Sequence, residues 1–146
     1  NIVTSLELDP AEMEKRNIHL QQKYAEIEEK EVRYEEIHCD DAEYLIVAFG
    51  SCARIAQKAM EEARAEGIKV GLLRPITLWP FPSKAIAERS RQVKGILTVE
   101  LNAGQMVEDV RLAVECKVPV EYFGRLGGIV PDPDEVVTAL KEKIIK

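Results

Sequence analysis

The sequence predicts a three-layer α/β/α fold around a mostly parallel sheet. Three observations lead to this prediction. Runs rich in Ile, Val and Leu alternate with segments of helical period, the runs are almost continuously apolar, and turn residues separate them. Strands covered on both faces need such runs, and their alternation with helices implies right-handed crossovers between parallel strands. The 146 residues correspond to about one domain.

The first predicted element is a long helix over residues 9–30. Asp9 can cap this helix, and Pro10 fits the first helical position. Its apolar stripe is narrow and consists of Met13, Leu20, Tyr24 and Ile27. A narrow stripe fits a helix that crosses between two domains as well as one that packs on its own domain. We therefore predict an N-terminal linker and helix over residues 1–31, followed by a domain over residues 32–146.

Five strands and four helices are predicted in that domain. The first strand, Val32–Ile37, alternates with charges as an edge strand does. Four apolar strands are predicted at Leu45–Phe49, Val70–Leu73, Ile96–Leu101 and Val118–Phe123. The helices are predicted at about 51–66, 83–91, 104–115 and 133–145.

Local signals place three of the helix ends. Ser51 is suited to cap the helix that follows the strand ending at Phe49. Gly67 is suited to the left-handed position just after the end of that helix. Asp132 is suited to cap the last helix, with Pro133 at its first position.

Charge and cysteine content narrow the classes of partner. Twenty basic and 26 acidic residues give a net charge of −6, which argues against nucleic acid because phosphate binding needs a basic face. The apolar runs are too short to cross a membrane. Three cysteines without a CxxC pair favour a reducing cytoplasm and predict no metal site. The chain begins at Asn1 with no signal-peptide pattern, so we expect a fragment of a longer chain or a processed start.

A ligand crevice is predicted at the carboxyl ends of the strands, where α/β folds bind ligands. Its candidate residues are Gly50, Ser51, Asn102, Gly104 and Gln105. The two turns offer helix N-termini to an anion, but both also fit ordinary helix starts. Glu100 precedes the second turn, where a structural hydrogen-bonding role is favoured over a catalytic one.

A candidate subunit interface is predicted in the loop from Arg74 to Pro82, together with the glycine-rich segment 124–128. Three prolines stiffen this loop, and aromatic and arginine side chains on a stiff loop are typical interface anchors. The candidate interface residues are Arg74, Trp79, Phe81 and Arg125. The alternatives are that Trp79 covers the local core and that the glycine-rich segment 124–128 only connects two elements. With two isolated histidines, we predict no catalytic residue in this chain.

Several motifs together resemble a known family. They are the segments 48–51, 67–75, 78–82, 99–110, 122–125 and 127–128, with 1–4 and 13–16 near the start. They are similar to the C-terminal domain of the α-type subunit of 2-oxoacid:ferredoxin oxidoreductases, and in particular of the 2-oxoisovalerate (branched-chain 2-ketoacid) enzymes. The resemblance implies a transketolase C-terminal-like fold with strand order 1-3-2-4-5 and an antiparallel first strand.

The resemblance also implies a function for the whole enzyme. That enzyme converts a 2-oxoacid, coenzyme A and oxidised ferredoxin to acyl-CoA, CO2 and reduced ferredoxin, using thiamine diphosphate, Mg²⁺ and iron–sulfur clusters. Pyruvate is the substrate of other members. The motifs for these cofactors are not found in this sequence, so the resemblance implies a non-catalytic assembly and docking domain. Its partners would be a thiamine-diphosphate-binding subunit, a γ subunit and a ferredoxin-like subunit.

Two alternatives to this function remain at the sequence level. One is the C-terminal domain of a transketolase or of a 2-oxoacid dehydrogenase E1 β-chain, which share the predicted fold. The other is a module that binds an anion or part of coenzyme A at the point where the strand order reverses.

Overall fold

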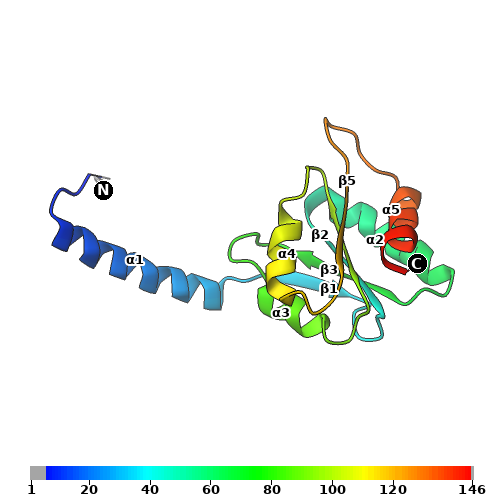
Figure 1. Ribbon diagram of the computed structural model, residues 1–146, viewed down its shortest axis with the longest axis horizontal. Helices are drawn as coiled ribbons and strands as arrows, with labels where there is room; N and C mark the ends of the chain where they lie inside the picture. Colours follow the sequence, from blue (N-terminus) through cyan, green and yellow to red (C-terminus); the bar gives the residue numbers. More distant parts are fainter. Residues whose placement is uncertain (1–5, 146) are drawn as a thin grey trace.

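The computed structural model describes residues 6–145 and contains one five-stranded sheet (Figure 1). The strands are β1 (Tyr34–Ile37), β2 (Tyr44–Ala48), β3 (Val70–Pro75), β4 (Ile96–Glu100) and β5 (Val120–Gly124). Their order is β1-β3-β2-β4-β5, with β1 antiparallel to β3 and the other neighbours parallel. The predicted strand order and the antiparallel first strand are confirmed.

Helices cover both faces of the sheet. They are α2 (Gly50–Ala65), α3 (Ser83–Arg89), α4 (Met106–Val114) and α5 (Pro133–Leu140), and α5 continues into a π-helical turn, η1 (Lys141–Ile145). One hydrophobic core lies between the sheet and α2 with α5, and the other lies between the sheet and α3 with α4. The three-layer prediction is therefore confirmed.

The two cores explain why the interior strands β2, β3 and β4 are apolar at most positions. In β2, Ile46 and Ala48 face the α2 side, while Leu45 and Val47 face the α4 side. Successive side chains of a strand point to opposite faces, so a sheet covered by helices on both sides needs apolar residues throughout.

Two of the three predicted helix ends agree with the structure. Gly67 has a φ of +87° after α2, and its N–H donates to the Arg64 carbonyl. Asp132 is the N-cap of α5, where the Glu135 carboxylate accepts the N–H of Asp132 at 3.0 Å. The prediction for Ser51 was wrong, because the N-cap of α2 is Phe49 and Ser51 lies inside the first turn.

The N-terminal helix α1 (Pro10–Lys30) projects away from the domain (Figure 1). Asp9 caps it as predicted, accepting the N–H of Ala11 at 2.8 Å. None of its residues is buried, although Met13 and Ile27 are half-buried. The resemblance of residues 1–4 lies outside the described residues.

All the helices of the domain begin at one edge of the sheet, the carboxyl edge. The parallel strands β2, β3, β4 and β5 end there, and the antiparallel β1 begins there. The linker from α1 reaches the same edge, since the Arg33 carbonyl accepts the N–H groups of Ile76 and Thr77 after β3. Over residues 6–145, no helix is both long and apolar enough to cross a membrane.

Candidate functional site

The predicted crevice lies where the strand order reverses. β2 and β4 are neighbours, with Ala48 opposite Val99, so the turns after the two strands start side by side. Gly50 and Ser51 are exposed in the first turn of α2, and Gln105 is exposed just before α4. The topology thus brings the two halves of the predicted crevice to one place at the carboxyl edge.

The side chain of Glu100 occupies the α4 half of this crevice. It is fully buried at the end of β4. Its carboxylate accepts the main-chain N–H of Met106 at 2.8 Å and of Val107 at 3.0 Å. It also accepts the Asn102 side-chain amide at 3.1 Å and the N–H of Gln105 at 3.3 Å. The first turn of α4 therefore directs its N–H groups at a carboxylate of the same chain.

This arrangement explains how a buried carboxylate is tolerated. A charge removed from water needs several donors, and the N-terminus of a helix supplies both N–H groups and a favourable dipole. The anion that an α/β fold usually binds at such a place is here a side chain of the protein. The structure assigns Glu100 a structural role, which is the role that the sequence favoured.

Neighbouring groups close the turn after β4. The Asn102 side chain accepts the N–H of Gly104 at 2.7 Å, and the Tyr122 hydroxyl donates to the Asn102 carbonyl. Burial, with the Glu100 charge as the next cause, raises the pKa of both Tyr122 and Cys52. Cys52 belongs to α2, so Glu100 exerts its charge on both sides of the crevice.

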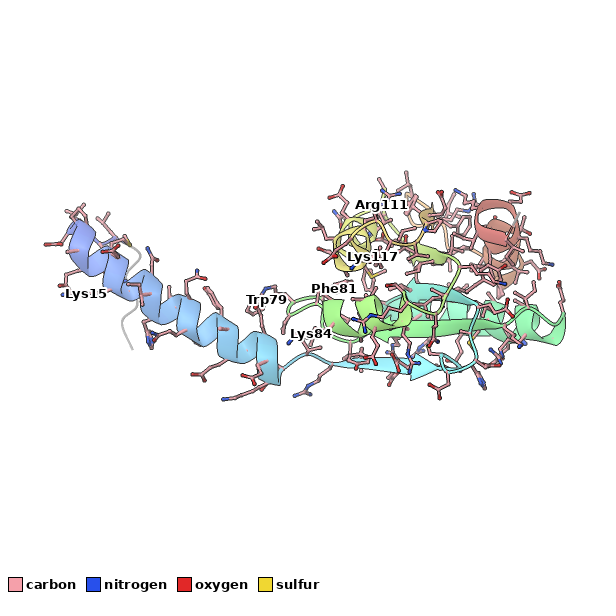
Figure 2. The ribbon with its side chains drawn as sticks, turned by 60° about the horizontal axis from the view of Figure 1, so that its bottom comes forward. Lys15, Trp79, Phe81, Lys84, Arg111 and Lys117 are labelled. Atoms are coloured by element: carbon pink, nitrogen blue, oxygen red, sulfur yellow. The ribbon has the colours of Figure 1, made fainter. Side chains whose placement is uncertain are left out.

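Of the candidate interface residues, Trp79 is the most exposed. Its side chain is 56% exposed and meets the Tyr24 ring of α1 edge to face, with the ring centroids 5.6 Å apart. Figure 2 shows Trp79 between the end of α1 and the domain. The Trp79–Pro80 bond is cis. Trp79 thus lies over a partner from α1 and leaves about half of its surface open.

A groove of about 810 Å³ runs beside Trp79, between the end of α1 and the start of α3. It is lined in part by Tyr34, Trp79, Phe81, Glu28 and Lys84. Phe81 also packs against the core on the α4 side, so only part of it faces outward.

The two candidate arginines already have partners within the chain. Arg74 pairs with Glu35 of β1 at 2.9 Å, and Arg125 pairs with Glu135 of α5. Arg125 and Trp79 follow β5 and β3, which are separated by two strands in the sheet. The four candidates are therefore spread along the carboxyl edge and do not form one compact cluster.

One feature of this edge was not predicted from the sequence. Leu126, Ile129 and Val130 are 57–61% exposed in the loop after β5. Their apolar character within a glycine- and proline-rich loop was the available signal. Exposure could not be inferred from it, because such residues are often covered by a neighbouring element.

The cysteines do not form a common site. Cys39 lies after β1, Cys52 in α2 and Cys116 after α4, and all three are free thiols. Among residues 6–145, no group of three or more His, Cys, Asp or Glu side chains is placed to hold a metal ion.

We expect the three thiols to differ sharply in reactivity. Cys39 and Cys52 are each 3% exposed, whereas Cys116 is exposed. Burial, aided by the Glu36 charge, raises the pKa of Cys39 to about 11, so the reactive thiolate is scarce at pH 8. Iodoacetamide at pH 8 should label Cys116 first, as measured by peptide mass spectrometry, and the other two only after unfolding. Equal labelling of Cys39 in the native state would contradict this burial.

The chain is similar in sequence to a known family and to a characterised enzyme subunit. Residues 42–136 match the sequence family "Pyruvate:ferredoxin oxidoreductase core domain II". The ketoisovalerate oxidoreductase subunit VorB of Methanothermobacter thermautotrophicus is 51% identical over 142 residues, which are 97% of this chain and 40% of that protein. This chain therefore spans about two-fifths of the length of that relative.

Two solved structures share the fold. The 2-oxoglutarate:ferredoxin oxidoreductase from Magnetococcus marinus, with 2-oxoglutarate, coenzyme A and succinyl-CoA bound, superposes with a TM-score of 0.80. That match is 24% identical and covers 93% of this chain and 24% of the other. A split-gene transketolase superposes with a TM-score of 0.66 at 22% identity, covering 75% of this chain and 40% of the other. Both likenesses concern the fold.

Proposed function

This chain belongs to the pyruvate:ferredoxin oxidoreductase core domain II family, and from that premise we propose that it is the assembly and docking domain of a 2-oxoacid:ferredoxin oxidoreductase subunit. The 51% identity to a ketoisovalerate oxidoreductase subunit supports 2-oxoisovalerate, or another branched-chain 2-oxoacid, as the substrate of the complete enzyme. The proposed reaction joins the acyl group of the 2-oxoacid to coenzyme A, releases CO2 and transfers the electrons to ferredoxin.

One observation carries the structural role of this domain. The crevice at which α/β folds usually bind ligands contains the buried carboxylate of Glu100, which accepts hydrogen bonds from its own chain. A carboxylate engaged in this way holds β4 and α4 together and directs both of its oxygens at N–H donors of its own chain. The domain therefore fits a scaffold better than a catalytic unit.

The cofactors of the proposed enzyme would be held elsewhere in the complex. Thiamine diphosphate supplies the electron sink for decarboxylation, and iron–sulfur clusters carry the electrons. The cysteines described above come from three separate segments, whereas a cluster needs closely spaced thiolates. Within residues 6–145, the cysteines and the other metal-ligating side chains do not fit an iron–sulfur cluster. We assign the cofactors and Mg²⁺ to companion subunits or to other parts of the longer subunit.

The same proposal includes partners, domain division and location. Companion subunits that bind thiamine diphosphate and carry the clusters would contact this domain, and the complex would act in the cytoplasm. We propose a domain over residues 32–146 and a separate helical linker over residues 1–31. The division is supported by α1, which contributes no buried residue.

The alternative enzymes with this fold are less well supported. The likeness to a transketolase is one of fold alone, at 22% identity. The family match over residues 42–136 points to the ferredoxin-linked enzymes. As for an anion site, Glu100 fills the α4 half of the crevice, and only the first turn of α2 stays open there.

A direct assay tests the proposed function. The full-length subunit, co-expressed with its companion subunits under anaerobic conditions, should reduce ferredoxin only when a 2-oxoacid and coenzyme A are both present. We expect kcat/KM for 2-oxoisovalerate to exceed that for pyruvate or 2-oxoglutarate by at least about tenfold, a difference of about 1.4 kcal/mol in the activation barrier. Coenzyme A-independent turnover, or a preference for pyruvate, would refute the enzyme or the substrate assignment respectively.

A further inference from the structure

The exposed large apolar side chains of the α/β domain gather at one edge. Within residues 32–145 they are nine in number, and eight of them lie at or just beyond the carboxyl edge of the sheet. These eight are Tyr34, Ile76, Leu78, Trp79, Leu101, Leu126, Ile129 and Val130. The exception is Leu112 on the outer face of α4.

The opposite edge of the sheet has a different character. Its connecting segments carry no exposed large apolar residue among residues 32–145. Charged side chains pair across them, such as Asp41 with Arg64 at 2.6 Å and Glu43 with Lys94 at 2.5 Å. Exposed apolar residues are common on any surface when scattered, so their concentration at one edge is the informative feature.

The loop after β5 is the most prominent part of the apolar edge. It stands out from the domain in Figure 1, between β5 and α5. Leu126, Ile129 and Val130 in this loop are each more than half exposed, and residues 126–130 contain no charged side chain. Gly127 and Gly128 both have positive φ values, so the loop follows a path that other residues adopt only with strain.

Carboxylates form the rim around these apolar residues. Among residues 6–145, six carboxylates at the ends of α1, α4 and α5 on this side enter no ion pair, and they are Glu28, Glu29, Glu108, Asp109, Asp132 and Asp134. Near the starts of α2 and α3, the cations that form no ion pair within residues 6–145 are Arg54 and Lys84. An apolar centre with a charged rim is the usual anatomy of a protein interface.

We propose that the carboxyl edge of the sheet is a docking surface for a companion subunit that presents an apolar centre and a Lys- and Arg-rich rim. The identification of that subunit as part of an oxidoreductase rests on the proposed function. A second copy of this chain would bring two acidic rims together, and an anionic membrane would be repelled in the same way. A charged rim speeds the encounter of separate molecules, which favours a companion subunit over another part of the same polypeptide.

The test replaces the apolar loop within the complete complex. The full-length subunit carrying Leu126→Asp, Ile129→Asp and Val130→Asp is co-expressed with its companions, and the subunit dissociation constant is measured by dilution and native mass spectrometry. We expect it to rise at least about tenfold, because exposed apolar anchors carry much of the binding energy of an interface. Leu112→Asp is the control, a leucine that is even more exposed (76%) but lies away from this edge, and it should leave the constant within about twofold.

A second variant tests the charge of the partner. Glu28→Lys with Glu29→Lys places cations in the last turn of α1, where the helix dipole favours them, so folding should be preserved. We expect weaker association and a smaller dependence on salt. The control, Glu142→Lys, lies in η1, where Lys141 pairs with Glu66 at the end of α2, and should change neither.

Each outcome decides a part of the proposal. A loop variant that associates as well as Leu112→Asp overturns the docking surface. If the loop variant associates as tightly as the wild type but exchanges hydrogen faster than the wild type in residues 124–131, the loop docks on its own polypeptide. The assignment of a companion subunit is then wrong. If the variant with Glu28→Lys and Glu29→Lys associates as tightly as the wild type, the partner does not have a basic rim, but the apolar docking surface stands. A wild-type complex that dissociates as expected but does not reduce ferredoxin would refute the proposed enzyme and leave the docking surface intact.

Discussion

Replacing Glu100 with alanine is expected to destabilise the domain by about 3 kcal/mol. The Glu100 carboxylate accepts the N–H groups of Met106 and Val107, and the side chain is fully buried. Alanine would leave these buried donors without an acceptor, at about 1–3 kcal/mol each, and would also leave a cavity. Urea unfolding of the 146-residue chain, followed by circular dichroism, measures the change in the free energy of unfolding.

Two further variants test whether Glu100 stabilises the domain by accepting hydrogen bonds or only by filling space. Glu100→Gln keeps the size of the side chain but replaces one accepting oxygen with an NH2 group, so we expect an intermediate loss of about 1–2 kcal/mol. Glu61→Ala, on the exposed face of α2, should stay within about 0.5 kcal/mol of the wild type. If Glu100→Gln is as stable as the wild type, the carboxylate only fills space, and the structural role given to it here is wrong.

The fold was largely predictable because its signals are local. Each interior strand must be apolar on both faces, and this leaves an almost continuous run in the sequence, as in 45–48 and 96–99. A helix end can be predicted where its backbone conformation favours one residue type. Gly67 adopts the positive φ that follows α2, and Asp132 caps the start of α5. Ser51 shows the limit of such signals. A serine near the start of a helix suits the cap position, yet the cap of α2 lies two residues earlier, at Phe49, and Gly50 follows it with a positive φ.

The site was less predictable because its contacts join residues far apart in the sequence. The ion pairs of Arg74 with Glu35 and of Arg125 with Glu135 cannot be recognised among 20 cations and 26 carboxylates by spacing alone. Glu100 was recognisable as a carboxylate at the end of a strand, but its donors depend on how α4 turns back over it. The loop after β5 is exposed because no other element packs over it, and the local sequence pattern cannot predict this.

Gly124 is the last residue of β5 and lies opposite Glu100, where β4 ends. Gly124→Ala is expected to destabilise the domain by about 2–4 kcal/mol. A Cβ at this position would lie 2.6 Å from the Glu100 carbonyl oxygen and would also meet the Tyr122 hydroxyl. The carbonyl belongs to the neighbouring strand β4, so the contact can be relieved only by moving main chain, and overpacking of this kind is costly.

A second glycine with an equally short contact provides the control. A Cβ at Gly95 would lie 2.6 Å from a methyl group of Ile144, a side chain in η1 close to the end of the chain. That side chain can change its rotamer, so Gly95→Ala should cost less than about 1 kcal/mol. Thermal unfolding of both variants compares the two cases, and the Gly124 variant should also lose hydrogen-exchange protection at the Arg125 N–H, which donates to the Glu100 carbonyl at 3.3 Å. Equal stabilities of the two variants would mean that β4 and β5 separate easily at this end, and the Glu100 turn would then not be the rigid support of the carboxyl edge that its hydrogen bonds indicate.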